Sequence, residues 1–279
     1  MTVKLRELSI AHSPDTDDAF MYFGLAQNKV DTKGVAVRQV MKDIQSLNVE
    51  AVNGTYEVSA ISFAAYPRVR HLYKLLSCGS SMGENYGPMI VAKKPLSIEE
   101  LKNITVAIPG LETSAYLTMQ LWQPGLKVVA MHFDKILDAV VAGEVDAGLI
   151  IHEGQLTYKD AGLTQIVDLG VWWHQETGLP LPLGGNAVRK DLGDVMMQEA
   201  LRIFRTSVVY ALEHREEALY YALSFARDMD PKMADRFVSM YVNELTVDLG
   251  ERGKEAVRLF YQKAYDKGIL KELVVPEFV

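Results

Sequence analysis

The residue best placed for chemistry is a histidine that follows an apolar segment. Residues 148–151 are small or apolar, as in a buried strand, and His152 comes next in GLIIHEGQLTY. In open α/β sheets, ligands collect beyond the carboxyl ends of the strands. Imidazole titrates near neutral pH, so His152 can accept a proton without a large pKa shift. A histidine that only closes a strand end would give the same pattern, and both interpretations stay open.

Hydroxyl residues at two predicted strand–turn–helix corners form a second group. Ser62 follows VSAI and opens FAAYPRV, whereas Thr113 and Ser114 follow IPGLE and open AYLTMQLW. The first turn of a helix offers free N–H groups and a partial positive charge, and therefore binds carboxylates. Plain N-capping explains each hydroxyl on its own. Two such corners, one in each lobe, would clamp the two ends of an anionic ligand.

Other polar residues have weaker signals. His12 ends the first predicted strand and could line the same region. Asp15 to Asp18 begin the next helix, where carboxylates cap free N–H groups and complement the helix dipole; alternatively, their turn lines the ligand site. The single cysteine, Cys78, follows an apolar stretch and is interpreted as a small buried residue. One cysteine excludes an intramolecular disulfide.

Composition and missing motifs narrow the function classes. The chain has 279 residues and a formal net charge of −7, and no Lys/Arg stripe offsets that charge. Nucleic acid is therefore a poor partner, whereas a small carboxylated ligand remains compatible because binding depends on the local field. The sequence lacks GxGxxG, GxxxxGK[ST] and HExxH, so nucleotide cofactors and a zinc site have no support.

The elements that must position these residues alternate between strand and helix. Strand–helix–strand–helix–strand is predicted over the first ninety residues, and a second such unit begins near residue 94. The pattern from about residue 195 to 268 is helical almost throughout, with a break at His214. Alternation of this kind predicts sheets covered by helices.

The expected organisation is two lobes. Residues 1–93 and 181–279 form the large lobe and residues 94–180 the small lobe, with a hinge near 92–94 and 181–184. Two crossings of this kind let a cleft open and close around a ligand. The N-terminus lacks the apolar run of roughly 7–15 residues of a secretory signal, and no segment has the roughly 20 apolar residues of a membrane span. We therefore expect a cytoplasmic protein.

Several segments together resemble the 1,4-dihydroxy-6-naphthoate synthases of the futalosine route to menaquinone. They occur in the family's order between residues ~10 and ~190, and IIHE–TY and GLPLPLGG are the most specific. The segments are SPDTDDAFMYFGL, KDIQSLN, SAISFAAY, GPMIVAKKPL, VAIPGLETSAYL, EVDAGLIIHEGQLTY and GLPLPLGG.

The resemblance implies an α/β fold like type II periplasmic binding proteins, with a mixed, mostly parallel sheet flanked by helices in each lobe. It implies a lyase that converts cyclic dehypoxanthinylfutalosine to 1,4-dihydroxy-6-naphthoate without metal or organic cofactor. The family's base falls on His152. Its substrate contacts fall on Ala60, Ile61, Ser62, Ser114 and Ala115, to which we add Thr113 and, at lower rank, Asn48 and His12.

One departure and three alternatives remain. Many members read SPCPNDTF where this chain reads SPDTDDAF, which leaves the roles of Asp15 and Asp17 open; that of Glu153 is open as well. Chorismate dehydratase shares the expected fold, and so does a non-catalytic solute-binding protein for a small carboxylate. A ligand-sensing domain is disfavoured because no DNA-binding helix pair or basic patch is attached. Nothing in the sequence indicates an oligomeric state.

Overall fold

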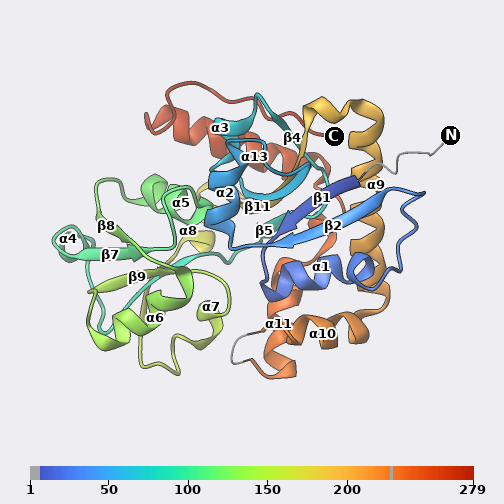
Figure 1. The fold of residues 1–279 in the computed structure, drawn as a ribbon. Coiled ribbons are helices and arrows are strands. Elements are labelled where there is room, and N and C mark those ends of the chain that lie inside the picture. Colours follow the sequence, from blue (N-terminus) through green and yellow to red (C-terminus); the bar gives the residue numbers. More distant parts are fainter. Residues whose placement is uncertain (1–6, 227–228) are drawn as a thin grey trace. The chain divides into compact units, whose positions relative to one another are not determined.

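A computed structural model describes residues 7–226 and 229–279, and the chain divides into two compact units. Unit 1 comprises residues 1–81, 184–251 and 276–279, and unit 2 comprises residues 82–183 and 252–275. Each unit contains its own sheet with helices packed on it (Figure 1). The mixed α/β architecture expected from the sequence is confirmed.

The sheet of unit 1 is mixed. Its strands are β1 (Glu7–His12), β2 (Ala36–Met41), β3 (Val58–Ser62), β4 (Tyr73–Leu75), β5 (Ser81–Gly83) and β11 (Leu181–Arg189). The order is β2-β1-β3-β11-β4, with β5 paired to β11. Strand β1 runs parallel to β2 and β3, whereas β11 runs antiparallel to β3 and β4. The parallel pairs thus occupy one half of the sheet.

Helices of unit 1 bury an aromatic core against this sheet. They are α1 (Thr16–Ala26), α2 (Ile44–Ala51), α3 (Tyr66–Val69), the 3₁₀ helix η1 (Lys190–Leu192), α9 (Asp194–Glu213), α10 (Arg215–Leu223), α11 (Pro231–Tyr241) and α12 (Glu244–Val247). Phe20 and Tyr22 of α1 pack with Phe204 of α9 in one buried cluster. The predicted break at His214 is confirmed, because α9 ends and α10 begins around that residue.

The sheet of unit 2 is also mixed. Its strands are β6 (Met89–Ala92), β7 (Thr105–Ile108), β8 (Lys127–Ala130), β9 (Ala147–Ile150) and β10 (Thr164–Asp168). They lie in the order β10-β6-β9-β7-β8. Strand β7 is parallel to β8 and β9, whereas β6 is antiparallel to β9 and β10. Parallel pairs do not predominate in either sheet.

Both faces of the unit 2 sheet are covered. The helices are α4 (Ile98–Leu101), α5 (Ser114–Trp122), α6 (Phe133–Ala142), α7 (Gly154–Thr157), α8 (Leu169–Thr177) and α13 (Gly250–Asp266). Alternate strand residues enter different clusters, as the two-residue period of a strand requires. Ile108 packs with Met119 of α5 on one face, whereas Ala107 packs with Ile136 of α6 on the other. Two covered faces explain why the inner strands β6 and β9 are apolar throughout, whereas the edge strands β8 and β10 carry polar residues and are less buried.

Local signals that the sequence shows are present in the structure. Ser97 and Glu100 form the predicted capping box at the start of α4. Gly143 ends α6 with φ of 78°, a left-handed conformation that glycine adopts without the steric cost of a side chain. By contrast, the helix expected over FAAYPRVRHLY is reduced to α3, because Pro67 begins a short turn and the chain then enters β4.

The unit boundaries differ from the expected lobes in two places. Strand β6 belongs to the unit 2 sheet, so the first passage between units falls at residues 81–82 and not at 92–94. Helix α13 groups mainly with unit 2, although residues 181–279 were all expected in the large lobe. The reason is packing, since the Phe260 ring meets the buried Trp173 ring edge-on with centroids 5.6 Å apart.

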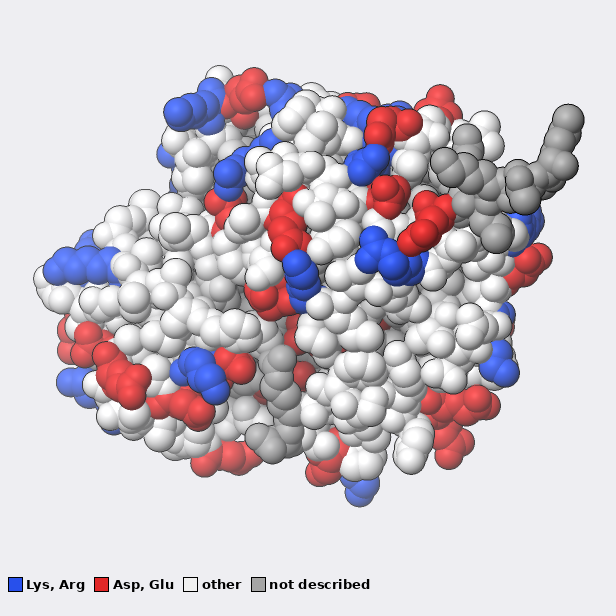
Figure 2. Space-filling model, viewed as in Figure 1, with Lys and Arg blue, Asp and Glu red and all other residues white. Residues whose placement is uncertain are grey.

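On the face drawn in Figure 2, Lys and Arg side chains are interspersed with Asp and Glu side chains. Ion pairs at the protein surface include Arg252 with Glu84 at 2.6 Å and Arg215 with Asp235 at 2.6 Å. Within the described part of the chain, every helix is too short or too polar to traverse a lipid bilayer.

Candidate functional site

The carboxyl ends of three neighbouring strands of unit 2 meet at one edge of the sheet. The register pairs Val106 with Ala147 and Ile108 with Ala130, so β9, β7 and β8 end side by side. His152 leaves this edge after β9, and the corner of Thr113 and Ser114 leaves it after β7. The structure therefore places these predicted residues at the edge where α/β sheets hold ligands.

His152 has an unusual backbone conformation. Its φ is 54°, in the left-handed region that few residues other than glycine adopt. The His152 carbonyl accepts a hydrogen bond from the Gln155 N–H at 3.1 Å, which closes the turn into α7. The residue as a whole is half-buried, and its Nε2 atom is buried. Its imidazole meets the ring of Phe133 edge-on, with centroids 4.9 Å apart and an interplanar angle of 61°.

The corner after β7 is a capped helix start. Thr113 is the N-cap of α5, and its hydroxyl accepts from the Tyr116 N–H at 3.3 Å and donates to the Gly110 carbonyl at 2.8 Å. Ser114 and Ala115 are the first residues of α5 and are 3% and 4% exposed. The capping interpretation therefore holds for Thr113, because its hydroxyl makes both of these hydrogen bonds at the helix start. Ser114 lies where the first free N–H groups of the helix gather.

Two groups at this edge were not singled out from the sequence for this site. Phe133 begins α6 directly after β8, and His132 stacks on it with centroids 4.9 Å apart. His132 Nδ1 is 2.6 Å from the Asp134 carboxylate. An aromatic residue at a helix start looks like ordinary core in the sequence, and only the strand order brings it beside His152.

In unit 1, Ser62 and Asn48 form a reciprocal buried pair. The Asn48 side chain donates to the Ser62 hydroxyl at 3.0 Å and accepts from the Ser62 N–H at 2.8 Å. Ser62 is the last residue of β3, followed by a turn, and so it does not open a helix as the sequence suggested. Ala60 and Ile61 precede it in β3 and are 5% and 0% exposed. Asn48, ranked low from the sequence, orients Ser62.

His12 ends β1, which lies beside β3 with Ala11 opposite Ser59. Its ring stacks on Tyr22 with centroids 3.9 Å apart, and its two nitrogens contact the Ser13 carbonyl at 2.8 Å and the Gln39 side-chain oxygen at 3.2 Å. Burial lowers the pKa of His12 below its ordinary 6.5. At neutral pH the ring is therefore uncharged and held in place, as a structural or hydrogen-bonding group would be.

The aspartates at the start of α1 do not cap it in the expected way. Asp15 is the N-cap residue by backbone geometry but makes no side-chain capping bond. Its carboxylate accepts from the Ser13 hydroxyl at 2.7 Å, and the Asp18 carboxylate accepts from the Ser13 N–H at 2.9 Å. Asp17 accepts from the Ser81 hydroxyl at 3.3 Å. The Asp15 and Asp18 carboxylates order the turn itself, because both accept from Ser13, whereas Asp17 contacts β5.

Cys78 is buried as interpreted from the sequence, and burial raises the pKa of its thiol to about 12. A thiol with that pKa is uncharged near neutral pH and is a poor nucleophile. In the described part of the chain, no three His, Cys, Asp or Glu side chains are grouped as ligands for a metal ion.

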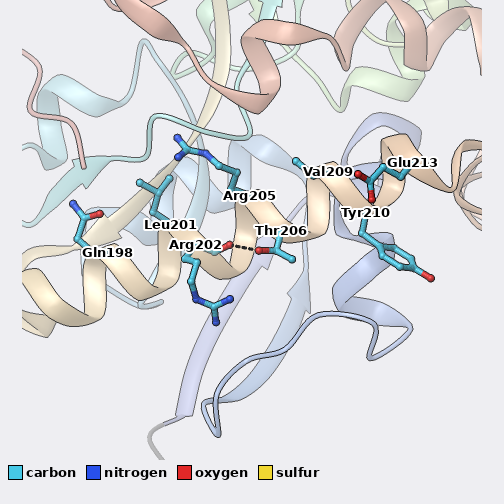
Figure 3. A pocket seen from close by; sticks show the side chains of 8 residues that line it. All are labelled: Gln198, Leu201, Arg202, Arg205, Thr206, Val209, Tyr210 and Glu213. Atoms are coloured by element: carbon cyan, nitrogen blue, oxygen red, sulfur yellow. Dashed lines mark hydrogen bonds between the residues drawn. The ribbon is translucent and has the colours of Figure 1, made fainter.

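Two open hollows lie on the helices of unit 1, away from the strand ends. One of about 400 Å³ follows α9 and is lined by eight side chains of that helix (Figure 3). Its Arg202 and Arg205 are already paired with Glu199 at 2.5 Å and Asp248 at 2.7 Å. A second hollow of about 700 Å³ lies beside α10. A hollow lined by one helix with paired charges lacks the convergent polar groups of a catalytic site.

Comparisons with known proteins agree with this architecture. A family model described as menaquinone biosynthesis matches residues 8–266. A 1,4-dihydroxy-6-naphthoate synthase of Thermus thermophilus is 38% identical over 275 residues, covering 99% of this chain and 100% of that protein. One of Streptomyces coelicolor is 36% identical over 272 residues, covering 95% of each chain.

Solved structures show the same fold. The crystal structure of an Archaeoglobus fulgidus protein has a TM-score of 0.91 at 43% identity, covering 95% of this chain and 98% of that one. An alkanesulfonate-binding protein of Xanthomonas axonopodis pv. citri, bound to MOPS, has a TM-score of 0.71 at 13% identity and 96% coverage of both chains. The expected periplasmic-binding-protein-like fold is thereby confirmed.

Proposed function

We propose that this chain, which belongs to the menaquinone biosynthesis family, is a lyase that converts cyclic dehypoxanthinylfutalosine to 1,4-dihydroxy-6-naphthoate in the cytoplasm. The observation that carries the proposal is the near-full-length similarity to two proteins named as 1,4-dihydroxy-6-naphthoate synthases. Matches of 95–99% of the chain include both sheets and both strand-end regions, so the similarity extends over the candidate site residues.

His152 is the general base of the proposal. It removes a proton made acidic by a neighbouring carbonyl, and the electrons of that C–H bond form a ring double bond as the sugar-derived part leaves. The formation of an aromatic diol supplies the driving force. A positioned base contributes typically about 10²–10⁴-fold to the rate. The position of the imidazole after β9, in edge-on contact with the Phe133 ring, supports this role.

The substrate carboxylate is proposed to meet Ser114 and Ala115. These residues form the first turn of α5, where backbone N–H groups and the helix dipole favour an anion. Thr113 acts differently, because its hydroxyl caps the helix and so keeps that first turn in place.

The unit 1 residues are proposed as further substrate contacts. Asn48 fixes the Ser62 hydroxyl and N–H, so this pair presents Ala60, Ile61 and Ser62 in one defined geometry. His12 is proposed as a further contact beside β3, where its ring stacks on Tyr22 and burial lowers its pKa.

The direct test is turnover of the purified protein with cyclic dehypoxanthinylfutalosine and, separately, with chorismate. The proposal expects formation of 1,4-dihydroxy-6-naphthoate from the first substrate only. If the reaction needs no metal or organic cofactor, the rate of product formation should be the same after exhaustive dialysis against a chelator. Conversion of chorismate instead would assign the dehydratase, and tight binding of either compound without turnover would assign a solute-binding protein.

Two variants test the assigned roles. His152→Asn keeps a polar side chain at the same backbone position and should bind substrate but lose about 10²–10⁴-fold in kcat. Ser114→Ala should mainly raise KM, because it removes a ground-state contact with the carboxylate. Thr118→Ser in the next turn of α5 is the control and should change neither constant. Undiminished turnover of His152→Asn would remove the imidazole from the mechanism.

A further inference from the structure

The contact between Phe133 and His152 joins two strand ends that are not adjacent. Phe133 follows β8 and His152 follows β9, and β7 lies between these strands in the sheet. The two side chains therefore meet across the carboxyl end of β7, where the corner that carries Ser114 begins. An aromatic side chain thus touches the proposed base at the same edge as the proposed carboxylate site.

The backbone of His152 does not by itself set the direction of the imidazole. Its φ of 54° and the hydrogen bond from the Gln155 N–H to its carbonyl fix the main chain. The two side-chain torsions of histidine remain, and packing must select one orientation. The Phe133 ring supplies one such packing contact, since a centroid distance of 4.9 Å and an angle of 61° are in the range of a specific edge-to-face pair.

Phe133 is itself held from two sides. The His132 ring stacks on the Phe133 ring, with centroids 4.9 Å apart and an interplanar angle of 29°. The Asp134 carboxylate lies 2.6 Å from His132 Nδ1 and fixes the His132 ring. Helix α6, which begins at Phe133, is anchored in the core by Ile136 and Val140. These contacts restrain the ring that meets His152.

We propose that Phe133 is a positioning residue that orients the His152 imidazole for proton removal. This inference rests on the proposed function of His152. Phe133 need not touch the substrate, so its loss should lower kcat with little change in KM. We expect a decrease of about 10- to 100-fold, the size of effect that a misplaced catalytic group produces.

The first experiment measures kcat and KM for Phe133→Leu and Phe133→Tyr. Leucine keeps an apolar side chain but removes the ring, whereas tyrosine keeps the ring and should restore at least a third of wild-type kcat. Phe225→Leu is the matched control, because Phe225 also meets a ring edge-on, that of Tyr221 at 5.2 Å, in unit 1. Its kcat should equal that of the wild type.

The second experiment observes the imidazole C–H resonance of His152 by NMR in the ligand-free protein, assigned by its absence in His152→Asn. The six histidines keep this region of the spectrum simple. Phe133→Leu should remove the ring-current shift of this resonance, and Phe133→Tyr should keep it. This measurement needs no turnover, and if Phe133→Leu does not fold, the tyrosine and wild-type spectra still test whether the shift exists.

The outcomes separate this inference from the proposed function. An inactive wild-type protein would refute the proposed function, whereas the NMR experiment would still decide whether the Phe133 ring contacts the His152 imidazole in solution. An active wild type with an unchanged His152 resonance or an unchanged kcat in Phe133→Leu would overturn the inference alone. Equal losses in Phe133→Leu and Phe133→Tyr would overturn it as well, because the ring would then be irrelevant.

Discussion

Replacing His152 by glycine and by alanine should reveal backbone strain at the proposed base. Both variants remove the imidazole and its contact with Phe133, so these losses cancel when the two are compared. What differs is the cost of holding φ at 54°. Alanine carries a Cβ that makes this conformation unfavourable, and glycine does not.

Two opposing effects set the difference in stability between the glycine and alanine variants. The left-handed conformation costs an L-residue about 1–2 kcal/mol, which His152→Gly recovers and His152→Ala does not. Glycine loses about 0.4–1 kcal/mol relative to alanine because its unfolded chain is freer. The glycine variant should therefore be more stable than the alanine variant by about 0–1.6 kcal/mol, which is the reverse of the usual order.

Urea unfolding followed by tryptophan fluorescence measures this difference. Trp122, Trp172 and Trp173 all lie in unit 2, so the signal reports the unit that contains His152. Lys159 is the control, because it is exposed, follows α7 in the same region and is outside the set of positive-φ residues. There alanine should be more stable than glycine. If the two positions show the same order, no strain is stored at His152.

Three further outcomes follow from other contacts. Asn48→Ala leaves the Ser62 N–H buried without its acceptor and should lower the free energy of unfolding by about 1–3 kcal/mol, measured by urea titration. The folded-state pKa of His12 lies below 6.5, so the neutral ring stabilises the folded protein fully above pH 6.5. This stabilisation is lost as the pH falls toward the lower pKa, by up to about 1.4 kcal/mol per pH unit. In His12→Gln, the midpoint of urea unfolding should therefore change less with pH between pH 5 and 7 than in the wild type. Gly170→Ala would place a Cβ 1.9 Å from the Tyr86 carbonyl oxygen, so its melting temperature should fall by more than about 5 °C in calorimetry.

The sequence predicts the parallel half of each sheet well, because its signals are local. Buried apolar runs such as residues 147–150 read as strands, and the turn residues that follow them begin helices. Capping signals at Ser97 and Gly143 are equally local. His152 was predicted as a candidate because it follows the apolar run of β9, and Ser114 because it begins a helix after the turn that follows β7.

The antiparallel half depends on partners that are distant in the chain. Strand β10 pairs with β6 through residues more than seventy positions apart, and only the folded sheet defines that pairing. The position of helix α13 is likewise not predictable from the sequence. Its amphipathic pattern indicates that one face is buried, but it does not indicate which unit that face packs against. The contact of Phe260 with Trp173 decides this, and no spacing in the sequence encodes it.

At the carboxyl edge of the unit 2 sheet, the sequence reveals the polar candidates but not the residue that orients them. A base or an anion site needs a polar group at a strand end, so residue type and position together mark His152 and Ser114. A residue that orients the base needs only shape and rigidity, which Phe133 shares with core aromatics. Its role follows from the order β9-β7-β8, which brings the ends of strands twenty residues apart in the chain to within one ring contact. Positioning residues of this kind should therefore be sought among ordinary apolar residues that follow the strands next to a catalytic one.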